Sequence, residues 1–158
     1  MHFKTRTHAG QLLADALAKK YQGTDAVVYA LPRGGVPLGL AIAKALNAPL
    51  DLIIPRKIGH PSNPEYAICA ITEAGESICN EQAVSHIDPV WLEQEKQQET
   101  TEAKRRRECY LTDRKAVPIA GKLAILVDDG IATGLTMLAA IHDLKNRQPR
   151  KIVVAIPV

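Results

Sequence analysis

The segment 123–136 constrains the fold of this chain more than any other. Its first residues, Leu123 to Val127, are all apolar and predict a buried strand. Two adjacent carboxylates, Asp128 and Asp129, follow, and then comes a short loop rich in glycine and threonine. Apolar residues at helical spacing start at Leu135 and predict a helix directly after the loop. A strand that leads through a polar loop into a helix is typical of an α/β sheet.

The same segment has the chemistry of a binding site for a sugar phosphate. The backbone N–H groups of a small-residue loop and of a helix N-terminus offer partial positive charge to a phosphate. The two carboxylates would repel that phosphate, so they face another part of the ligand, and the paired hydroxyls of a ribose are suitable donors. The residues therefore indicate a ribose 5-phosphate unit. A plain turn, in which the glycines and threonines only shape and cap the chain, is the alternative.

This segment resembles the motif with which the type I phosphoribosyltransferases bind phosphoribosyl pyrophosphate (PRPP). That motif has four apolar residues, two acidic residues and a loop ending in Thr-Gly-x-Thr, and all its defining positions match here. The chain is closest to a bacterial and archaeal group of predicted phosphoribosyltransferases. The resemblance implies that Asp128 and Asp129 hold the ribose hydroxyls and that one of them reaches Mg²⁺, directly or through water. The PRPP-binding residues that it implies are Asp128, Asp129, Gly130, Ile131, Ala132, Thr133, Gly134, Leu135 and Thr136.

A second candidate loop, Arg33-Gly34-Gly35, follows an apolar run at 26–31. A cation and two glycines suit a pyrophosphate, because glycine lets backbone N–H groups approach closely. The resemblance supports this role, since the family binds pyrophosphate after its first core strand. The dinucleotide motif Gly-x-Gly-x-x-Gly is the competing interpretation, but Gly34, Gly35 and Gly39 have the wrong spacing for it. A simple strand-to-helix turn is the other alternative.

Two further cations, Arg56 and Lys57, follow the apolar run at 50–55. The resemblance implies that a basic residue here approaches the pyrophosphate and that the loop after it closes over the site. The expected catalytic residues are thus Asp128, Asp129, Lys57 and Arg33, and the expected pyrophosphate-binding residues are Arg33, Gly34, Gly35, Arg56 and Lys57. Solvated loop charges are the alternative for both cations, and His60 in this loop is a weaker phosphate candidate.

The order of apolar runs predicts a doubly wound α/β domain with a mainly parallel sheet. Ligands in such sheets bind beyond the carboxyl ends of the strands, where both candidate loops lie. The 158 residues suit one domain, 1–158, with an insertion over about 56–115. Helices are predicted at 7–21, 36–47, 89–112 and from 135, strands at 26–31, 50–55, 123–127 and 152–157, a mobile loop at 56–66, and a hairpin from 67–72 and 77–80.

Bulk properties limit the partners of the chain. The net charge is +3, and no run is apolar and long enough to span a membrane. Lys104 to Arg107 could form a nucleic-acid patch, but a solvated face of a long helix is favoured. Cys69, Cys79 and Cys109 lack Cys-x-x-Cys spacing, so we expect reduced thiols in a cytoplasmic protein. The expected partners are PRPP, a small-molecule acceptor and Mg²⁺, with no membrane or nucleic acid, and a homodimer is left open.

Two departures from the family bear on the acceptor. Relatives that act on 6-oxopurines place an aspartate in the slot of Ala132, and alanine cannot accept a proton, which weighs against those bases. The chain also ends at Val158, just after a predicted core strand, whereas the family usually continues into a hood over the acceptor. A hood would therefore come from residues 1–20 and 56–115 or be incomplete. Tyr66 and Tyr110 are the candidates for stacking on a base.

Three functions remain open from the sequence. The first is a Mg²⁺-dependent phosphoribosyltransferase of nucleotide metabolism, which transfers the 5-phosphoribosyl group from PRPP to a nitrogenous acceptor and releases pyrophosphate. The second is a regulatory module that binds PRPP or a nucleotide without catalysis, with the basic helix face at 104–107 as a contact for RNA or protein. The third is an α/β domain without a ligand.

Overall fold

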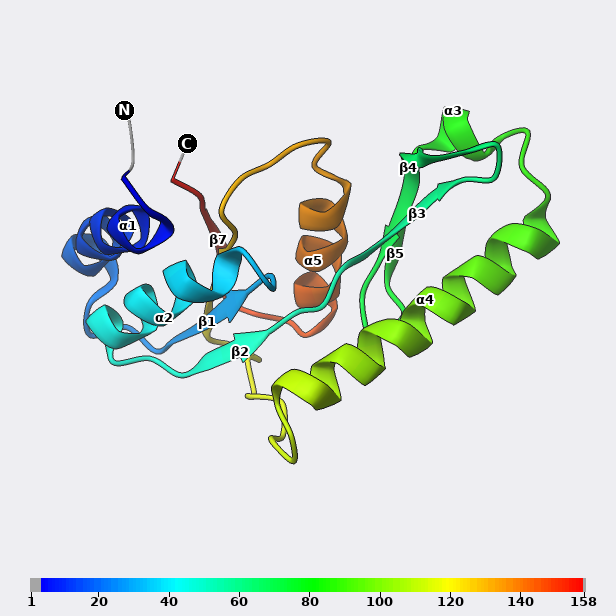
Figure 1. The fold of residues 1–158 in the computed structure, drawn as a ribbon. Coiled ribbons are helices and arrows are strands. Elements are labelled where there is room, and N and C mark those ends of the chain that lie inside the picture. The colour runs from blue at the N-terminus through cyan, green and yellow to red at the C-terminus, as the bar shows by residue number, and fades with distance from the viewer. Residues whose placement is uncertain (1–3, 158) are drawn as a thin grey trace. The chain divides into compact units, whose positions relative to one another are not determined.

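The computed structural model describes residues 4–157 (Figure 1). These residues group into two compact units. Among the described residues, the first contains 4–53, 115–132 and 144–157, and the second contains 54–114 and 133–143. Residues 1–3, which begin the 1–20 segment expected to contribute to a hood, lie outside the described residues, as does Val158.

The first unit is built on a parallel sheet with the strand order β2-β1-β6-β7. Its strands are β2 (Leu50–Leu52), β1 (Ala26–Ala30), β6 (Leu123–Val127) and β7 (Lys151–Ala155). Every residue of the two central strands is buried, which explains why both are continuous apolar runs in the sequence. The predicted α/β class with a mainly parallel sheet is confirmed.

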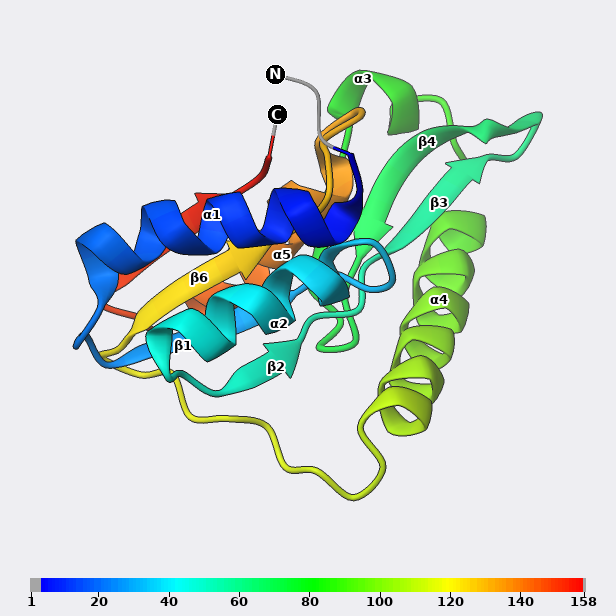
Figure 2. The ribbon, with the colours of Figure 1, turned by 60° about the vertical axis from the view of Figure 1, so that its left-hand side comes forward.

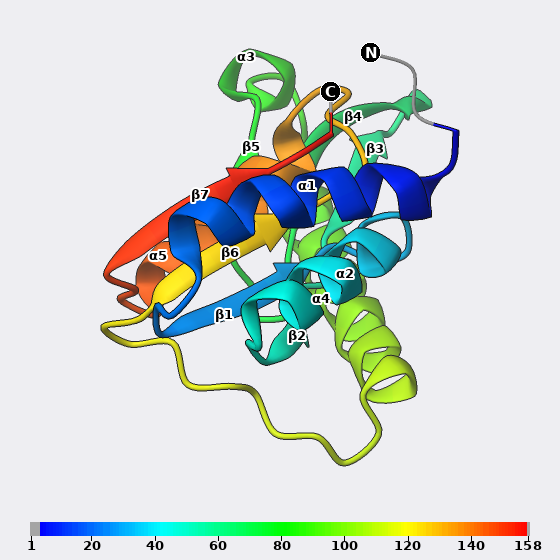
Figure 3. The same ribbon diagram turned by 90° about the vertical axis from the view of Figure 1, so that its left-hand side faces the viewer.

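Two helices, α1 (Arg6–Tyr21) and α2 (Gly35–Leu46), lie side by side over one face of this sheet (Figures 2 and 3). They approach closely at Gly10, where a Cβ atom would lie 3.1 Å from the Cα of Leu38. Small residues on α1 thus let the two backbones pack tightly. The core beneath them consists mainly of aliphatic side chains from both helices and the sheet: Ala14, Val28, Leu38, Ile42, Leu46, Leu123, Ile125 and Val127.

The second unit contains an antiparallel sheet with the order β3-β4-β5. Its strands are β3 (Arg56–His60), β4 (Asn63–Ile71) and β5 (Ser77–Cys79). The predicted hairpin of 67–72 and 77–80 is confirmed. The predicted mobile loop at 56–66 is wrong, because β3 and the start of β4 pair across it, with register shifts on both sides of Gly59. Proline, glycine and adjacent cations suggested a loop, but pairing with β4 overrides these local preferences.

Two helices of the second unit follow the hairpin. The short α3 (Glu81–Val84), absent from the sequence prediction, is capped by Asn80, whose side chain accepts hydrogen bonds from two backbone N–H groups. The long α4 (Pro89–Tyr110) begins as predicted, with Asp88 as its cap and proline in its first turn. Ala103 is its buried residue. On this helix, Glu102 pairs with Arg106 one turn later, at 3.0 Å.

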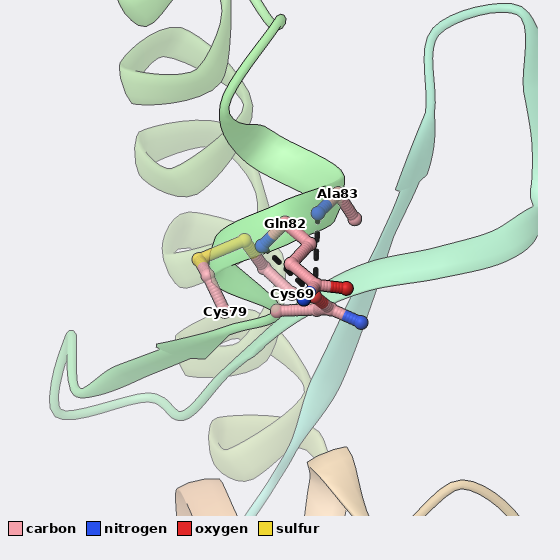
Figure 4. The surroundings of a disulfide bond; sticks show 5 residues. Cys69, Cys79, Gln82 and Ala83 are labelled. Carbon is pink, nitrogen blue, oxygen red and sulfur yellow. Dashed lines mark hydrogen bonds between the residues drawn. A yellow bond between two sulfur atoms is a disulfide. The ribbon is translucent and has the colours of Figure 1, made fainter.

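A disulfide joins Cys69 to Cys79 (Figure 4). The two residues face each other directly in the β4–β5 register, with their Cα atoms 4.0 Å apart. The prediction of reduced thiols is therefore wrong for this pair, whereas Cys109 is free and exposed. The hairpin creates the proximity, and a separation of ten residues in the sequence gave no sign of it.

The last helix, α5 (Leu135–Asn146), follows the segment 128–134, and its residues up to Asp143 group with the second unit. Both the helix and the strand before it occur where the sequence predicts them. Within residues 4–157, no helix has the length and apolar character needed to cross a membrane.

Candidate functional site

The two candidate loops of the first unit start at the same edge of its sheet. β1 and β6 pair in parallel, with Ala30 opposite Val127, so the chain leaves both strands at one level. The N–H of Leu31 then donates to the carbonyl of Val127 at 3.0 Å. This hydrogen bond holds the loop 31–35 against the start of the acidic pair. The carboxyl edge of the sheet is where ligands of open α/β folds bind.

Two glycines let this loop lie directly against the acidic pair. A Cβ atom on Gly35 would lie 2.6 Å from the carbonyl oxygen of Val127, so a side chain cannot fit there without a shift of the backbone. A Cβ atom on Gly34 would collide with the carboxylate of Asp129. The structure therefore brings Gly34 and Gly35 together with Asp128 and Asp129. The sequence predicted that these glycines let backbone N–H groups come close to a pyrophosphate. The structure adds that they make room for the acidic pair.

The loop offers a specific set of donors. The N–H of Gly35 is already used, because it donates to the carbonyl of Leu31 at 3.0 Å. Among the interactions within residues 4–157, the N–H groups of Arg33 and Gly34 donate no hydrogen bond. Arg33 is exposed, and the peptide bond before it is cis. An anion at this loop would therefore meet two backbone donors and a guanidinium group.

The acidic pair is ordered by its own backbone and by a distant cation. Asp128 Oδ1 accepts a hydrogen bond from the N–H of Asp129 at 2.8 Å. Asp129 Oδ2 accepts a hydrogen bond from Arg6 Nε, also at 2.8 Å. The side chain of Asp129 stays 32% exposed, so a ligand can reach it. Sequence reasoning missed Arg6, because a charged residue at the start of a helix carries no sign of a partner 123 positions away.

The segment after the acidic pair is accessible and rich in free donors. Residues 131–133 are exposed and 134–136 are half-buried. Within the described residues, the backbone N–H groups of 130–134 donate no hydrogen bond. Gly134 has a φ of +83°, and its carbonyl accepts the N–H of Leu138 at the start of α5. Unpaired N–H groups before a helix are the feature that binds phosphate in other folds.

Arg56 and Lys57, the two cations expected to bind pyrophosphate, belong to the second unit and differ in their surroundings. Arg56 Nε donates to Glu99 Oε2 of α4 at 2.7 Å, and both side chains are largely buried. Lys57, the next residue of β3, is exposed. Neighbouring residues of a strand point to opposite faces, so one cation stabilises the unit and the other faces solvent. His60 Nδ1 lies 2.8 Å from Ser62 Oγ, and Tyr66 and Tyr110 are exposed.

The second unit also buries a carboxylate in the turn between β4 and β5. Glu73 is 7% exposed; its Oε2 accepts the N–H of Ile54 at 2.8 Å, and its Oε1 contacts Arg107 at 3.3 Å. Burial raises the pKa of Glu73, while the hydrogen bond from Ile54 and the charge of Arg107 oppose that rise. Glu73 thus ties the start of β3 to α4. An acidic residue two positions before a turn glycine, here Gly75, is usually solvated, so no sequence signal revealed this contact.

The geometry of the first unit agrees with the comparisons with known proteins. A family model described as "Phosphoribosyl transferase domain" matches residues 4–158. The chain belongs to the phosphoribosyltransferase family. Within this family, a Mycobacterium tuberculosis protein named "Putative phosphoribosyl transferase" is 40% identical over 99% of the chain. The match covers 35% of that protein, so the chain spans about a third of the length of the curated relatives it matches.

Solved structures have a similar fold. The protein TT1426 from Thermus thermophilus is 40% identical, with a TM-score of 0.80 over 99% of this chain and 74% of that one. A purine phosphoribosyltransferase from Pyrococcus horikoshii is 16% identical, with a TM-score of 0.57 over 99% of this chain and 74% of that chain. At that identity, the second match shows the phosphoribosyltransferase fold alone.

Proposed function

We propose that this chain carries the PRPP site of a Mg²⁺-dependent phosphoribosyltransferase. The reaction transfers the 5-phosphoribosyl group to a nitrogenous acceptor and releases pyrophosphate. One observation carries the proposal: the carboxylates of Asp128 and Asp129 stand at the edge of the sheet, and they are followed directly by the N–H groups of 130–134, which have no acceptor among residues 4–157. This arrangement suits a ligand with hydroxyl groups next to a phosphate.

Each part of the proposed site has a distinct role. Asp128 and Asp129 accept hydrogen bonds from the ribose hydroxyls, which fixes the sugar. The backbone at 130–136 binds the 5-phosphate, since within the described residues the N–H groups of 130–134 donate no hydrogen bond and residues 131–133 are exposed. The N–H groups of Arg33 and Gly34 and the guanidinium of Arg33 bind the pyrophosphate. Lys57 is the proposed second cation for the leaving group, in preference to Arg56, which is paired with Glu99.

The chemical step replaces one bond at C1 of the ribose with another. The C1–O bond to pyrophosphate breaks and its electron pair leaves with the pyrophosphate. An acceptor nitrogen donates the pair that forms the C1–N bond, and its proton passes to water. Positive charge develops on the sugar during this exchange. Fixed carboxylates beside the ribose stabilise that charge, and cations at the pyrophosphate stabilise the departing negative charge. Relatives that act on 6-oxopurines place an aspartate in the slot of Ala132, so this residue weighs against those bases without selecting another acceptor.

The acidic pair also fits Mg²⁺. This ion prefers oxygen ligands and is usually held by one or two carboxylates together with substrate phosphates and water. Asp128 and Asp129 supply carboxylates of that kind, and Asp129 is accessible from solvent. Bound there, Mg²⁺ would neutralise charge on the pyrophosphate.

Calorimetric titration of PRPP in the presence of Mg²⁺ tests the proposal. We expect micromolar binding, about −8 kcal/mol, for the wild type. Asp128→Asn/Asp129→Asn should weaken binding about a hundredfold or more, because each lost charged hydrogen bond is worth roughly 1.5–3 kcal/mol. The matched control is Asp15→Asn/Asp25→Asn, which removes the same charge from exposed positions of the first unit and should bind normally.

Two results would contradict the proposal in different ways. If the wild type does not bind PRPP, PRPP is not the ligand of this site. Binding without release of pyrophosphate, across a panel of nitrogenous acceptors, would instead favour the regulatory module. Release of pyrophosphate that depends on one acceptor would support the enzyme and identify its substrate.

A further inference from the structure

The ion pair between Arg6 and Asp129 connects α1 to the acidic pair. Arg6 is the first residue of α1, and its Nε donates to Asp129 Oδ2 at 2.8 Å. The side chain of Arg6 is 67% exposed and that of Asp129 is 32% exposed. The pair therefore lies at the surface, where a ligand from solvent can meet it.

The position of Arg6 is determined by the packing of its helix. The close approach of Gly10 to Leu38 sets how α1 lies on α2. Thr5 caps the helix, because its Oγ1 accepts the N–H of His8 at 3.1 Å, so Arg6 stands in an ordered first turn. Arg6 thus reaches Asp129 from a defined position on the first unit.

Arg6, Asp129 and the loop at Gly34 meet at one point. A Cβ atom on Gly34 would collide with the Asp129 carboxylate, and the atom nearest to it is Oδ2, which also binds Arg6. Among the contacts within residues 4–157, the pair engages Nε of Arg6 and leaves its two terminal nitrogens without a hydrogen bond. Those nitrogens are planar donors of the kind that bind phosphate oxygens.

We infer that Arg6 is a further ligand-binding residue, whose terminal nitrogens bind the pyrophosphate oxygens of the substrate while its Nε stays on Asp129. The inference rests on the proposed function, because that function puts a pyrophosphate at Gly34. It also explains how two adjacent carboxylates tolerate a highly anionic ligand, since Arg6 offsets the charge of Asp129 on the side from which the pyrophosphate approaches.

A purely structural ion pair is the alternative. Exposed pairs of this kind contribute little to stability, and their loss would leave ligand binding unchanged. Ligand affinity therefore separates the two interpretations, whereas a melting temperature does not.

The experiment titrates inorganic pyrophosphate and PRPP, each with Mg²⁺, into the wild type and three variants. Arg6→Ala should lower the affinity for both ligands about tenfold, because it removes charged hydrogen bonds. Arg6→Lys should recover part of that loss, since it keeps the charge but not the planar fork. Lys19→Ala removes the same charge from the other end of α1 and should stay within twofold of the wild type. Circular dichroism verifies that each variant is folded.

The outcomes distinguish this inference from the proposed function. Equal affinity of the wild type and Arg6→Ala for both ligands would overturn the role of Arg6 alone. Pyrophosphate binding that depends on Arg6, without PRPP binding, would overturn the proposed function alone. If the wild type binds neither ligand, both fail.

A double variant separates direct contact from an effect through Asp129. With pyrophosphate as the ligand, the loss caused by Arg6→Ala should persist in an Asp129→Asn background if Arg6 touches the ligand. Disappearance of the loss in that background would mean that Arg6 only orients Asp129, and would overturn direct binding.

Discussion

The two compact units are stabilised in different ways. In the first, β1 and β6 bury every residue, and two helices cover them with aliphatic side chains. In the second, α4 buries Ala103, and its charged side chains hold the unit through specific pairs such as Arg56 with Glu99 and Arg107 with Glu73. A disulfide adds a covalent link to its sheet.

This difference shows which parts of the structure can be predicted from local sequence patterns and which depend on contacts between distant residues. Burial of continuous apolar runs is visible in the composition of a segment, so the first unit can be predicted from local patterns. Ion pairs and a disulfide join residues far apart in the chain, so the second unit depends on contacts that only the folded state provides. Its small apolar cluster centres on Ile58, Ile68 and Cys69.

The largest expected effect is on the core of the first unit. Leu126→Ala removes a fully buried side chain from β6 and should cost about 2–5 kcal/mol, because it loses burial and leaves a cavity. Urea unfolding followed by circular dichroism measures this cost. The control is Leu40→Ala on the exposed side of α2, for which we expect a change within about 0.5 kcal/mol. Equal costs would mean that burial does not stabilise the unit.

Loss of the disulfide should destabilise the second unit by a comparable but smaller amount. Cys69→Ala/Cys79→Ala opens a loop that spans ten residues of sequence. The free energy of unfolding should fall by about 3 kcal/mol, because the unfolded chain gains conformational entropy. Trp91, the chain's single tryptophan, packs against the same cluster, so its fluorescence reports unfolding of this unit.

Two comparisons make this test specific. Dithiothreitol should bring the wild type to the stability of the double variant, and Cys109→Ala should change nothing, because that thiol is free and exposed. Insensitivity of the Trp91 signal to reduction would show that the disulfide does not support the unit.

Glu73 should produce a smaller effect that depends on pH. Its pKa is raised in the folded state, so the folded protein holds this proton more tightly than the unfolded chain does. The contribution of Glu73 to stability therefore falls as the pH rises from its ordinary pKa of 4.5 through the higher folded value. Arg107 and Asp143 are the charged groups that face it.

The variant Glu73→Gln removes this titration. The difference in unfolding free energy between wild type and variant should shift in favour of the variant as the pH rises from 4.5 toward neutrality. Urea unfolding across that range measures the shift. A difference that stays constant with pH would show that Glu73 has the same pKa in both states.

The smallest expected effect is at Glu102, on the exposed face of α4. Arg105 and Arg106 hold the pKa of this carboxyl at about 2, so its contribution is present above its ordinary pKa and is lost as the pH falls toward 2. Because these ion pairs lie on the surface of α4, where salt screens them, Glu102→Gln should leave the melting temperature almost unchanged in high salt. Carboxyl NMR verifies the low pKa, and a large loss of stability in salt would contradict its surface character.

The sequence predicted that the two candidate loops of the first unit lie together, and the reason is physical. Parallel strands end at a common edge, so the loops after Leu31 and Val127 had to lie near each other once both runs were assigned to strands. The strand structure of residues 56–66 was harder to predict. Gly59 lets β4 come close to β3, and the residues around Gly59 in the sequence give no sign of this pairing.

The sequence by itself determined the parallel sheet, the acidic pair and the glycine loops, because each is encoded within a few consecutive residues. The tertiary structure alone decided three contacts: Arg6 on Asp129, Glu73 on the N–H of Ile54, and Cys69 opposite Cys79. The physical reason is the separation of the interacting residues along the sequence. Patterns of neighbouring residues specify the helices and strands and their ends, whereas distant side chains can pair only after packing brings the elements together.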